Sequence, residues 1–245
     1  MTASASRHTA FRDVDSMLDW VELLAAETGA AGRDQVRGRR PDVLGRAGRR
    51  DEQLRAGGCR LRDHRRGGEG GTGAAPLVFT DAVSLPFRSG FARVYAKFAE
   101  AGLTDGITFI GSGKLGLPDN AVAAMSLGCD LINVAREPML AVGCIQAQKC
   151  HTDRCPTGVA TQNPWLAHGL DAGIKSVRAA NYLRALRRDV FKVAEACGVA
   201  HPGLITASDV EVADGNRHSI TLADLYGYRT GWGCPVTPTV PRSPA

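Results

Sequence analysis

Three cysteines within twelve residues form the part of this sequence with the clearest capacity for chemistry. Cys144, Cys150 and Cys155 are separated by five and four residues, and Pro156 follows the last of them. Structural zinc sites favour closely paired cysteines and four ligands, which this spacing does not provide. Iron–sulfur clusters are held by thiolates, often with a proline after the last one, so we predict a cluster with three protein ligands. Three ordinary reduced cysteines are the alternative, but the polar residues around them are unlike a core.

The segment GSGKLG, residues 111–116, has the spacing G-x-G-x-x-G between a predicted strand and a predicted helix. Glycines let the backbone approach a phosphate, and a helix N-terminus supplies free N–H groups. A dinucleotide site would need an acidic residue at the end of the next strand, and a P-loop would need Ser or Thr after Lys114. Neither is present, which leaves a simple tight turn or the phosphate-binding turn of a βα-barrel. We favour the second.

A second glycine-rich segment, GGEGGTGAAP, occupies residues 67–76, ahead of the helix predicted over 86–101. Taken alone, it is equally consistent with a flexible linker and with a ligand-binding loop.

The elements that must position these loops alternate between short apolar runs and amphipathic stretches. Residues 107–110 and 131–134 read as buried strands, and helices are expected at 86–101, 118–127, 137–149 and 173–197. Residues 11–28 also have helical spacing of apolar side chains. The alternation from 107 to 143 predicts an α/β protein with a parallel sheet and crossover helices.

Composition narrows the class of protein. No apolar run is long enough to span a membrane and the N-terminus lacks a signal peptide, so we expect a cytoplasmic protein. Seven cysteines, an odd number without an export signal, argue against a disulfide framework. Residues 33–66 hold twelve arginines and a net charge of +7, whereas the other 211 residues carry −2. This segment has no aromatic residues interleaved with its charges, so we expect a disordered linker and not a nucleic-acid site.

Together, three strings closely resemble the FMN-binding domain of glutamate synthases: residues 67–76, residues 111–139, and GCIQAQKCHTDRCPTGVATQNP at 143–164. The resemblance covers residues 10–30 and 67–235. It implies a (β/α)8 TIM barrel with FMN at the carboxyl ends of its strands, and a 3Fe–4S cluster on Cys144, Cys150 and Cys155. The residues that it places at the FMN are Gly70, Gly71, Thr72, Gly73, Gly111, Ser112, Gly113, Lys114, Ala135 and Arg136.

The activity implied by the resemblance is that of an oxidoreductase acting on CH–NH2 donors. Electrons would pass through the cluster to FMN, and 2-oxoglutarate and ammonia would form L-glutamate by way of 2-iminoglutarate. The implied partners are the small-molecule substrate and an electron donor, either ferredoxin or an NAD(P)H-linked reductase subunit, with no nucleic acid or membrane. No catalytic residue is assigned.

The sequence also departs from the family pattern. It lacks the cysteine-initiated glutaminase domain, and its motifs belong to the second half of a barrel. We therefore expect an incomplete (β/α)8 barrel, second half only, with C-terminal helices. In this layout, residues 1–30 hold an N-terminal helix, 31–66 a non-family segment, 67–235 the barrel portion and 236–245 a disordered tail. Ala135 stands where relatives usually have glycine.

Residues 31–66 do not resemble the family although both flanks do. Codons that encode residues 33–40 can read GIKSAVG when shifted by one base, and those for 60–67 can read DFVTIDG, strings similar to the family's strands. We hypothesise two compensating frameshifts or sequencing errors across this segment. Because one side of the flavin pocket would then be missing, we predict little or no FMN binding, and a non-catalytic iron–sulfur-binding remnant or pseudogene product is the alternative to an enzyme.

Overall fold

A computed structural model describes residues 85–213, 215 and 218–233, the backbone of residues 33–34 and 62–66, and positions 12, 16, 19, 20, 23 and 27. The glycine-rich segment 67–76, the tail 236–245, Cys59 and Cys234 lie outside the described residues. The predictions that concern them stay predictions.

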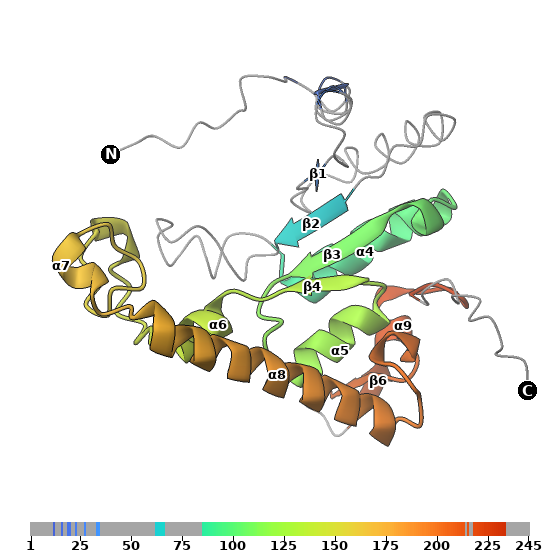
Figure 1. Ribbon diagram of the computed structural model, residues 1–245. Helices are drawn as coiled ribbons and strands as arrows, with labels where there is room; N and C mark the ends of the chain where they lie inside the picture. The colour runs from blue at the N-terminus through green and yellow to red at the C-terminus, as the bar shows by residue number, and fades with distance from the viewer. Residues whose placement is uncertain are drawn as a thin grey trace, which may run out of the picture.

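Four parallel strands form the main sheet, in the order in which they occur along the chain (Figure 1). They are β1 (Arg33–Asp34), β2 (Arg62–Arg66), β3 (Thr108–Ser112) and β4 (Leu131–Asn133). The prediction of an α/β protein with a parallel sheet is confirmed. A separate antiparallel pair joins β5 (Glu211–Ala213) to β6 (Ser219–Thr221).

Helices α4 (Phe87–Glu100) and α5 (Pro118–Ser126) connect the strands and share one face of the sheet. On that face, the Phe109 ring of β3 contacts rings of α4, and the end of α5 contributes Leu127 to the same cluster. Both crossovers therefore lie on one side, which is what right-handed connections between sequentially ordered parallel strands require.

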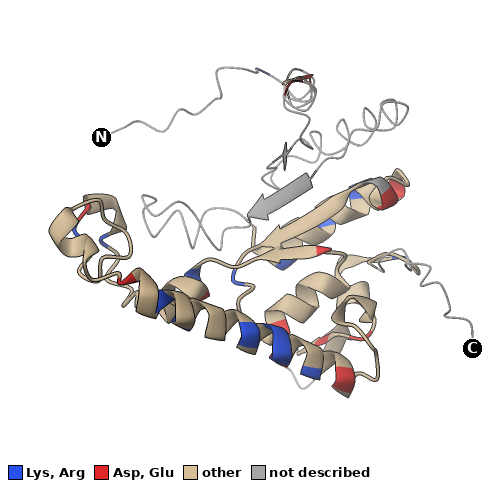
Figure 2. Ribbon diagram, in the orientation of Figure 1, with Lys and Arg blue, Asp and Glu red and all other residues tan. Residues whose placement is uncertain are grey.

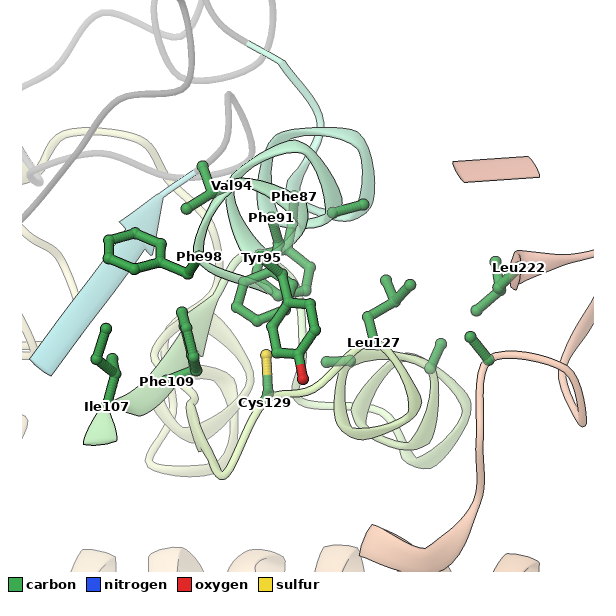
Figure 3. Close-up of a cluster of buried hydrophobic side chains, with 14 of the residues drawn as sticks. Phe87, Phe91, Val94, Tyr95, Phe98, Ile107, Phe109, Leu127, Cys129 and Leu222 are labelled. Atoms are coloured by element: carbon green, nitrogen blue, oxygen red, sulfur yellow. The ribbon is translucent and has the colours of Figure 1, made fainter. Parts of the chain in front are cut away.

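The core between these elements is rich in aromatic side chains (Figure 3). Phe91 stacks on Phe87 and Tyr95, with ring centroids 5.4 and 6.0 Å apart, and Phe109 meets Tyr95 at 5.1 Å. Cys129 is buried in this cluster, as expected of a core cysteine. Rings of this size bury large apolar areas, so the cluster supplies most of the cohesion between α4, α5 and β3.

A 25-residue helix, α8 (Ala172–Ala196), crosses the outside of α5 and reaches α6 (Arg136–Ala141) (Figure 1). Val190 and Ala194 pack on Ala121 and Val122 of α5. Lys and Arg positions recur along the α8 ribbon (Figure 2), and Arg184, Arg188 and Lys192 of this helix are exposed. The remaining short helices are η2 (Thr104–Gly106), η3 (Cys150–Thr152), α7 (Pro164–Ala167), η4 (Pro202–Leu204) and α9 (Leu222–Tyr226).

The expected helices and strands agree with the structure to within one or two residues, with one exception. The helix predicted over 137–149 ends at Ala141. Gly143 has a φ of +112°, and Gln146 and Gln148 have φ values of +55° and +56°. A right-handed helix needs negative φ, so the backbone after Ala141 turns away into an irregular loop that carries the cysteines.

The described positions before residue 67 agree with one sequence-based prediction and differ from another. Ser16, Asp19, Trp20, Leu23 and Glu27 are helical, in line with the helix expected over 11–28. The arginine-rich segment was expected to be disordered, yet it contributes β1 and β2 to the sheet. No helix among the described residues is long and apolar enough to cross a membrane.

Candidate cofactor site

The candidate site lies at the carboxyl edge of the main sheet, where three strands end in register. Arg66, the last residue of β2, pairs with Ser112, the last of β3, and Ser112 pairs with Asn133, the last of β4. The chain therefore leaves all three strands at one edge. The GGEGGTGAAP segment begins directly after Arg66, the GSGKLG turn spans the end of β3, and Ala135 follows β4 by two residues. The carboxyl edge is where open α/β sheets and barrels bind ligands.

Within the GSGKLG turn, a run of backbone N–H groups has no internal acceptor. The amides of Gly113, Lys114, Leu115 and Gly116 donate no hydrogen bond to any acceptor in the described part of the chain. Leu115 and Gly116 are nevertheless buried. Buried backbone donors are normally paired, so these amides are available to an anion beside the N-terminus of α5. Lys114, exposed and at a φ of +49°, adds a positive charge.

Gly111, which the resemblance places at the FMN, also has a packing role in the structure. A Cβ on this residue would lie 2.8 Å from both Cys129 Sγ and Phe87 Cζ, which are core atoms. Glycine at this position therefore lets the core close beneath the strand. The resemblance placed Gly111 at the FMN, and the side of its Cα that would carry a side chain faces the core.

After β4, Ala135 is the N-cap of α6 and its carbonyl accepts the Met139 N–H at 3.1 Å. Its φ is −134°, so the position does not need the left-handed conformation that favours glycine. The Ala135 side chain is exposed and Arg136 is half-buried. The alanine is thus accommodated by the described residues around it.

The cysteine loop, residues 143–163, surrounds two of its sulfurs with hydrogen-bond donors. The Gln146 N–H donates to Cys144 Sγ at 3.4 Å, and Cys155 Sγ lies 3.5 Å from the Thr157 hydroxyl. The Thr157 hydroxyl, together with nearby backbone N–H groups, lowers the pKa of Cys155 to about 7. Donors aimed at sulfur favour the thiolate, which is the form that ligates metals.

Two further contacts shape this loop. Asp153 adopts a left-handed φ of +60°, and its Oδ1 accepts the Gln162 N–H and lies 2.9 Å from the Thr161 hydroxyl. Gly158, at a φ of +77°, packs so closely against the end of α7 that a Cβ would lie 2.5 Å from the Leu166 carbonyl oxygen. These contacts explain why glycine follows Thr157 in the loop.

The structure does not gather ligands for a single metal ion. Among the described residues, no three His, Cys, Asp or Glu side chains converge on one point. Cys144 and Cys150 are half-buried, Cys155 is buried, and all three are free thiols. An iron–sulfur cluster distributes its thiolates over several irons, and the donors around the sulfurs fit such a group.

Sequence reasoning missed three residues that shape the site. Thr157 follows Cys155 by two positions, a local signal that could have been found. Tyr182 of α8 and Glu137 of α6 both approach Gly116. Tyr182 lies 66 residues from Gly116, so no sequence signal marks it.

These features define an α/β protein with a phosphate-type turn, residues 111–116, at its sheet edge and a separate loop, residues 143–163, that carries three cysteines. Residues 65–200, more than half of the chain, match the family model described as the conserved region in glutamate synthase. The chain belongs to this family.

Individual relatives agree with this assignment. The glutamate synthase large subunit-like protein YerD of Bacillus subtilis is 41% identical over 136 residues, which are 56% of this chain and 26% of that protein. The archaeal glutamate synthase [NADPH] of Methanocaldococcus jannaschii is 34% identical over 151 residues, 62% of this chain and 28% of the relative. The archaeal-type enzyme of Thermotoga neapolitana is 30% identical over 159 residues, 65% of this chain and 30% of the relative. The matched region thus spans under a third of each relative.

Proposed function

We propose that this chain contributes the FMN- and iron–sulfur-binding part of a glutamate synthase-type oxidoreductase. The reaction would form L-glutamate from 2-oxoglutarate and ammonia by way of 2-iminoglutarate. One-electron transfer by a 3Fe–4S cluster and hydride transfer by reduced FMN are the chemistry that these groups supply when bound. The electron donor would be ferredoxin or an NAD(P)H-linked reductase subunit.

The register of β2, β3 and β4 carries this proposal. It directs the segment after Arg66, the turn after Ser112 and the loop after Asn133 to one edge of the sheet. The free N–H groups of residues 113–116 would bind the FMN phosphate, with Lys114 adding charge. Cys144, Cys150 and Cys155 would hold the cluster; Cys144 Sγ accepts the Gln146 N–H, and the donors around Cys155 would stabilise its thiolate.

The sheet also supports a barrel portion. Sequential parallel order with α4 and α5 on one face is the arrangement of a (β/α)8 barrel. A doubly wound fold would instead reverse its strand order and place helices on both faces. We propose that β1–β4 are consecutive barrel strands.

A second candidate, a non-catalytic iron–sulfur-binding remnant, is favoured by the arginine-rich segment. Strand β2 is Arg62–Arg66, with the sequence RDHRR, where a buried parallel strand is ordinarily apolar. The frameshift hypothesis accounts for this composition, since β1 and β2 fall within the two stretches whose shifted readings are GIKSAVG and DFVTIDG. In that case the cysteine loop would keep its function while the flavin side loses it.

Reconstitution of the purified full chain tests the assignment. Anaerobic incubation with iron, sulfide and FMN should give cluster absorption and bound iron, both lost in Cys155→Ala. Cys197→Ala, at an exposed helix end, is the matched control and should retain them. Wild-type protein without iron would overturn the cluster assignment.

A strand-restored variant separates the two candidates. It carries GIKSAVG in place of residues 33–39 and DFVTID in place of 61–66, ahead of Gly67. An enzyme-type site predicts flavin binding in the wild type that the restored variant improves. A remnant predicts a cluster without flavin in the wild type. Flavin binding in neither protein would contradict the assignment of the FMN site.

A further inference from the structure

The long helix α8 makes contact with the phosphate-type turn through one hydroxyl. Tyr182 Oη donates to the carbonyl oxygen of Gly116 at 2.8 Å, across 66 residues of chain. Tyr182 is half-buried, and Gly116 is the last glycine of the GSGKLG turn. The bond therefore fixes the orientation of the Gly116–Leu117 peptide from outside the α/β layer.

Fixing this peptide also directs its N–H group. In a trans peptide the C=O and the following N–H point in opposite directions. Because the Gly116 carbonyl points to Tyr182, the Leu117 N–H points away from α8. That amide, like those of residues 113–116, donates to no acceptor among the described residues.

Glu137 of α6 also approaches Gly116. A Cβ at Gly116 would overlap the flexible side chain of Glu137, which shows how closely this side chain approaches the turn. Burial, and secondarily the negative charge of Glu137, raises the pKa of Tyr182 above its usual value. The phenol therefore stays protonated and remains a donor at neutral pH.

The same face of α8 also reaches the start of the cysteine loop. Lys175 precedes Tyr182 by seven residues, which places both side chains on one face of the helix. A Cβ at Gly143, the residue before Cys144, would lie 2.8 Å from Lys175 Nζ. Helix α8 thus contacts the segments that lead into both candidate cofactor sites.

We propose that Tyr182 is a positioning residue for a phosphate monoester. Its hydrogen bond to Gly116 holds the phosphate-type turn so that the backbone N–H groups of residues 113–117 are arranged for the anion. This inference rests on the proposed function, because the phosphate is that of FMN. Tyr182 acts through the turn and does not itself contact the ligand.

The test compares FMN with riboflavin, which lacks the phosphate, in binding to the full chain. Flavin fluorescence quenching gives both dissociation constants for the strand-restored protein and for its Tyr182→Phe variant. The variant should bind FMN about tenfold more weakly, the loss expected for one hydrogen bond. Its riboflavin affinity should not change. Tyr226→Phe, a half-buried tyrosine on α9, is the matched control and should leave both constants unchanged.

Each outcome has one meaning. Equal weakening of FMN and riboflavin binding would show that Tyr182 supports the fold only, and this result would overturn the inference. An FMN dissociation constant that is the same in Tyr182→Phe and in its parent would also overturn it. A parent protein that binds FMN no better than riboflavin, or binds neither, would overturn the phosphate site and the inference together. A thermal midpoint of Tyr182→Phe close to that of Tyr226→Phe verifies that both variants are folded.

Discussion

The α/β layer, residues 85–141, and the cysteine loop, residues 143–163, are held in place by different forces. The layer buries whole aromatic side chains, including Phe87, Phe91 and Phe109, each at most 2% exposed. In the cysteine loop, Cys155 and Gly158 are the buried positions among the described residues, and the rest relies on local hydrogen bonds. The phosphate-type turn is therefore held in place by the packed core next to it. The cysteine loop has few apolar contacts, so a bound cluster would be its main source of cohesion.

The largest expected effect comes from the core of the layer. Phe109→Ala removes a ring that contacts Phe91, Tyr95 and Phe98, and should lower the free energy of unfolding by about 3–5 kcal/mol. Trp165→Ala, at an 83% exposed position in α7, should change it by less than about 0.5 kcal/mol. Urea unfolding measures both. Similar losses would contradict the assignment of the buried aromatic cluster as the main source of stability.

Gly111→Ala probes the close packing under the turn. The new methyl would press on Cys129 and Phe87 and should cost about 1–3 kcal/mol. Combining it with Cys129→Ala should recover part of this loss, because the sulfur that the methyl meets is removed. A double-mutant cycle by urea unfolding measures the coupling. If the losses in unfolding free energy of the two single variants simply add, the new methyl group does not press on the Cys129 sulfur.

Asp130 links β3 to the start of β4, and its effect should be smaller. Its Oδ2 accepts the Phe109 N–H at 2.7 Å, so Asp130→Ala should cost about 1 kcal/mol, whereas Asp130→Asn keeps an acceptor. Burial raises the pKa of Asp130 above its ordinary value.

A raised pKa in the folded state means that folding favours the protonated acid. The stability of the wild type should therefore fall relative to Asp130→Asn as pH rises through the raised pKa. Unfolding titrations at several pH values measure this difference. An opposite slope would contradict the assignment of burial as the dominant cause.

The smallest global effect is expected in the cysteine loop. Asp153→Ala should leave the free energy of unfolding of the whole chain essentially unchanged, yet speed hydrogen exchange at the Gln162 N–H. The Gln162 N–H and then the Thr161 hydroxyl lower the pKa of Asp153. The stabilisation of the loop by the Asp153 carboxylate should thus be present at neutral pH. It should be lost as the pH falls through the lowered pKa of Asp153.

Asp153→Asn provides the control, since it keeps an acceptor but does not titrate. Its Gln162 protection should be independent of the acid transition once intrinsic exchange is subtracted. Cooperative unfolding of the whole chain in Asp153→Ala would show that the loop is part of the main core.

Secondary structure was largely predictable because most elements have strong local signals. Pro118 begins α5 and Gly128, at a φ of +104°, follows its end, both as the sequence indicates. The helix expected over 137–149 was too long because Gly143, at a φ of +112°, ends it after Ala141. Gln146 and Gln148 then adopt positive φ despite being good helix formers. That conformation belongs to the loop as a whole and has no signal in either residue.

The sequence by itself determined the parallel α/β pattern, the family and the spacing of the three cysteines, since each depends on residues close together along the chain. Tertiary structure decided which residues meet at the sheet edge. It made Gly111 a packing position and brought Tyr182 to Gly116. Contacts between residues 66 positions apart depend on how helices pack on the sheet, and packing is a property of the whole folded chain.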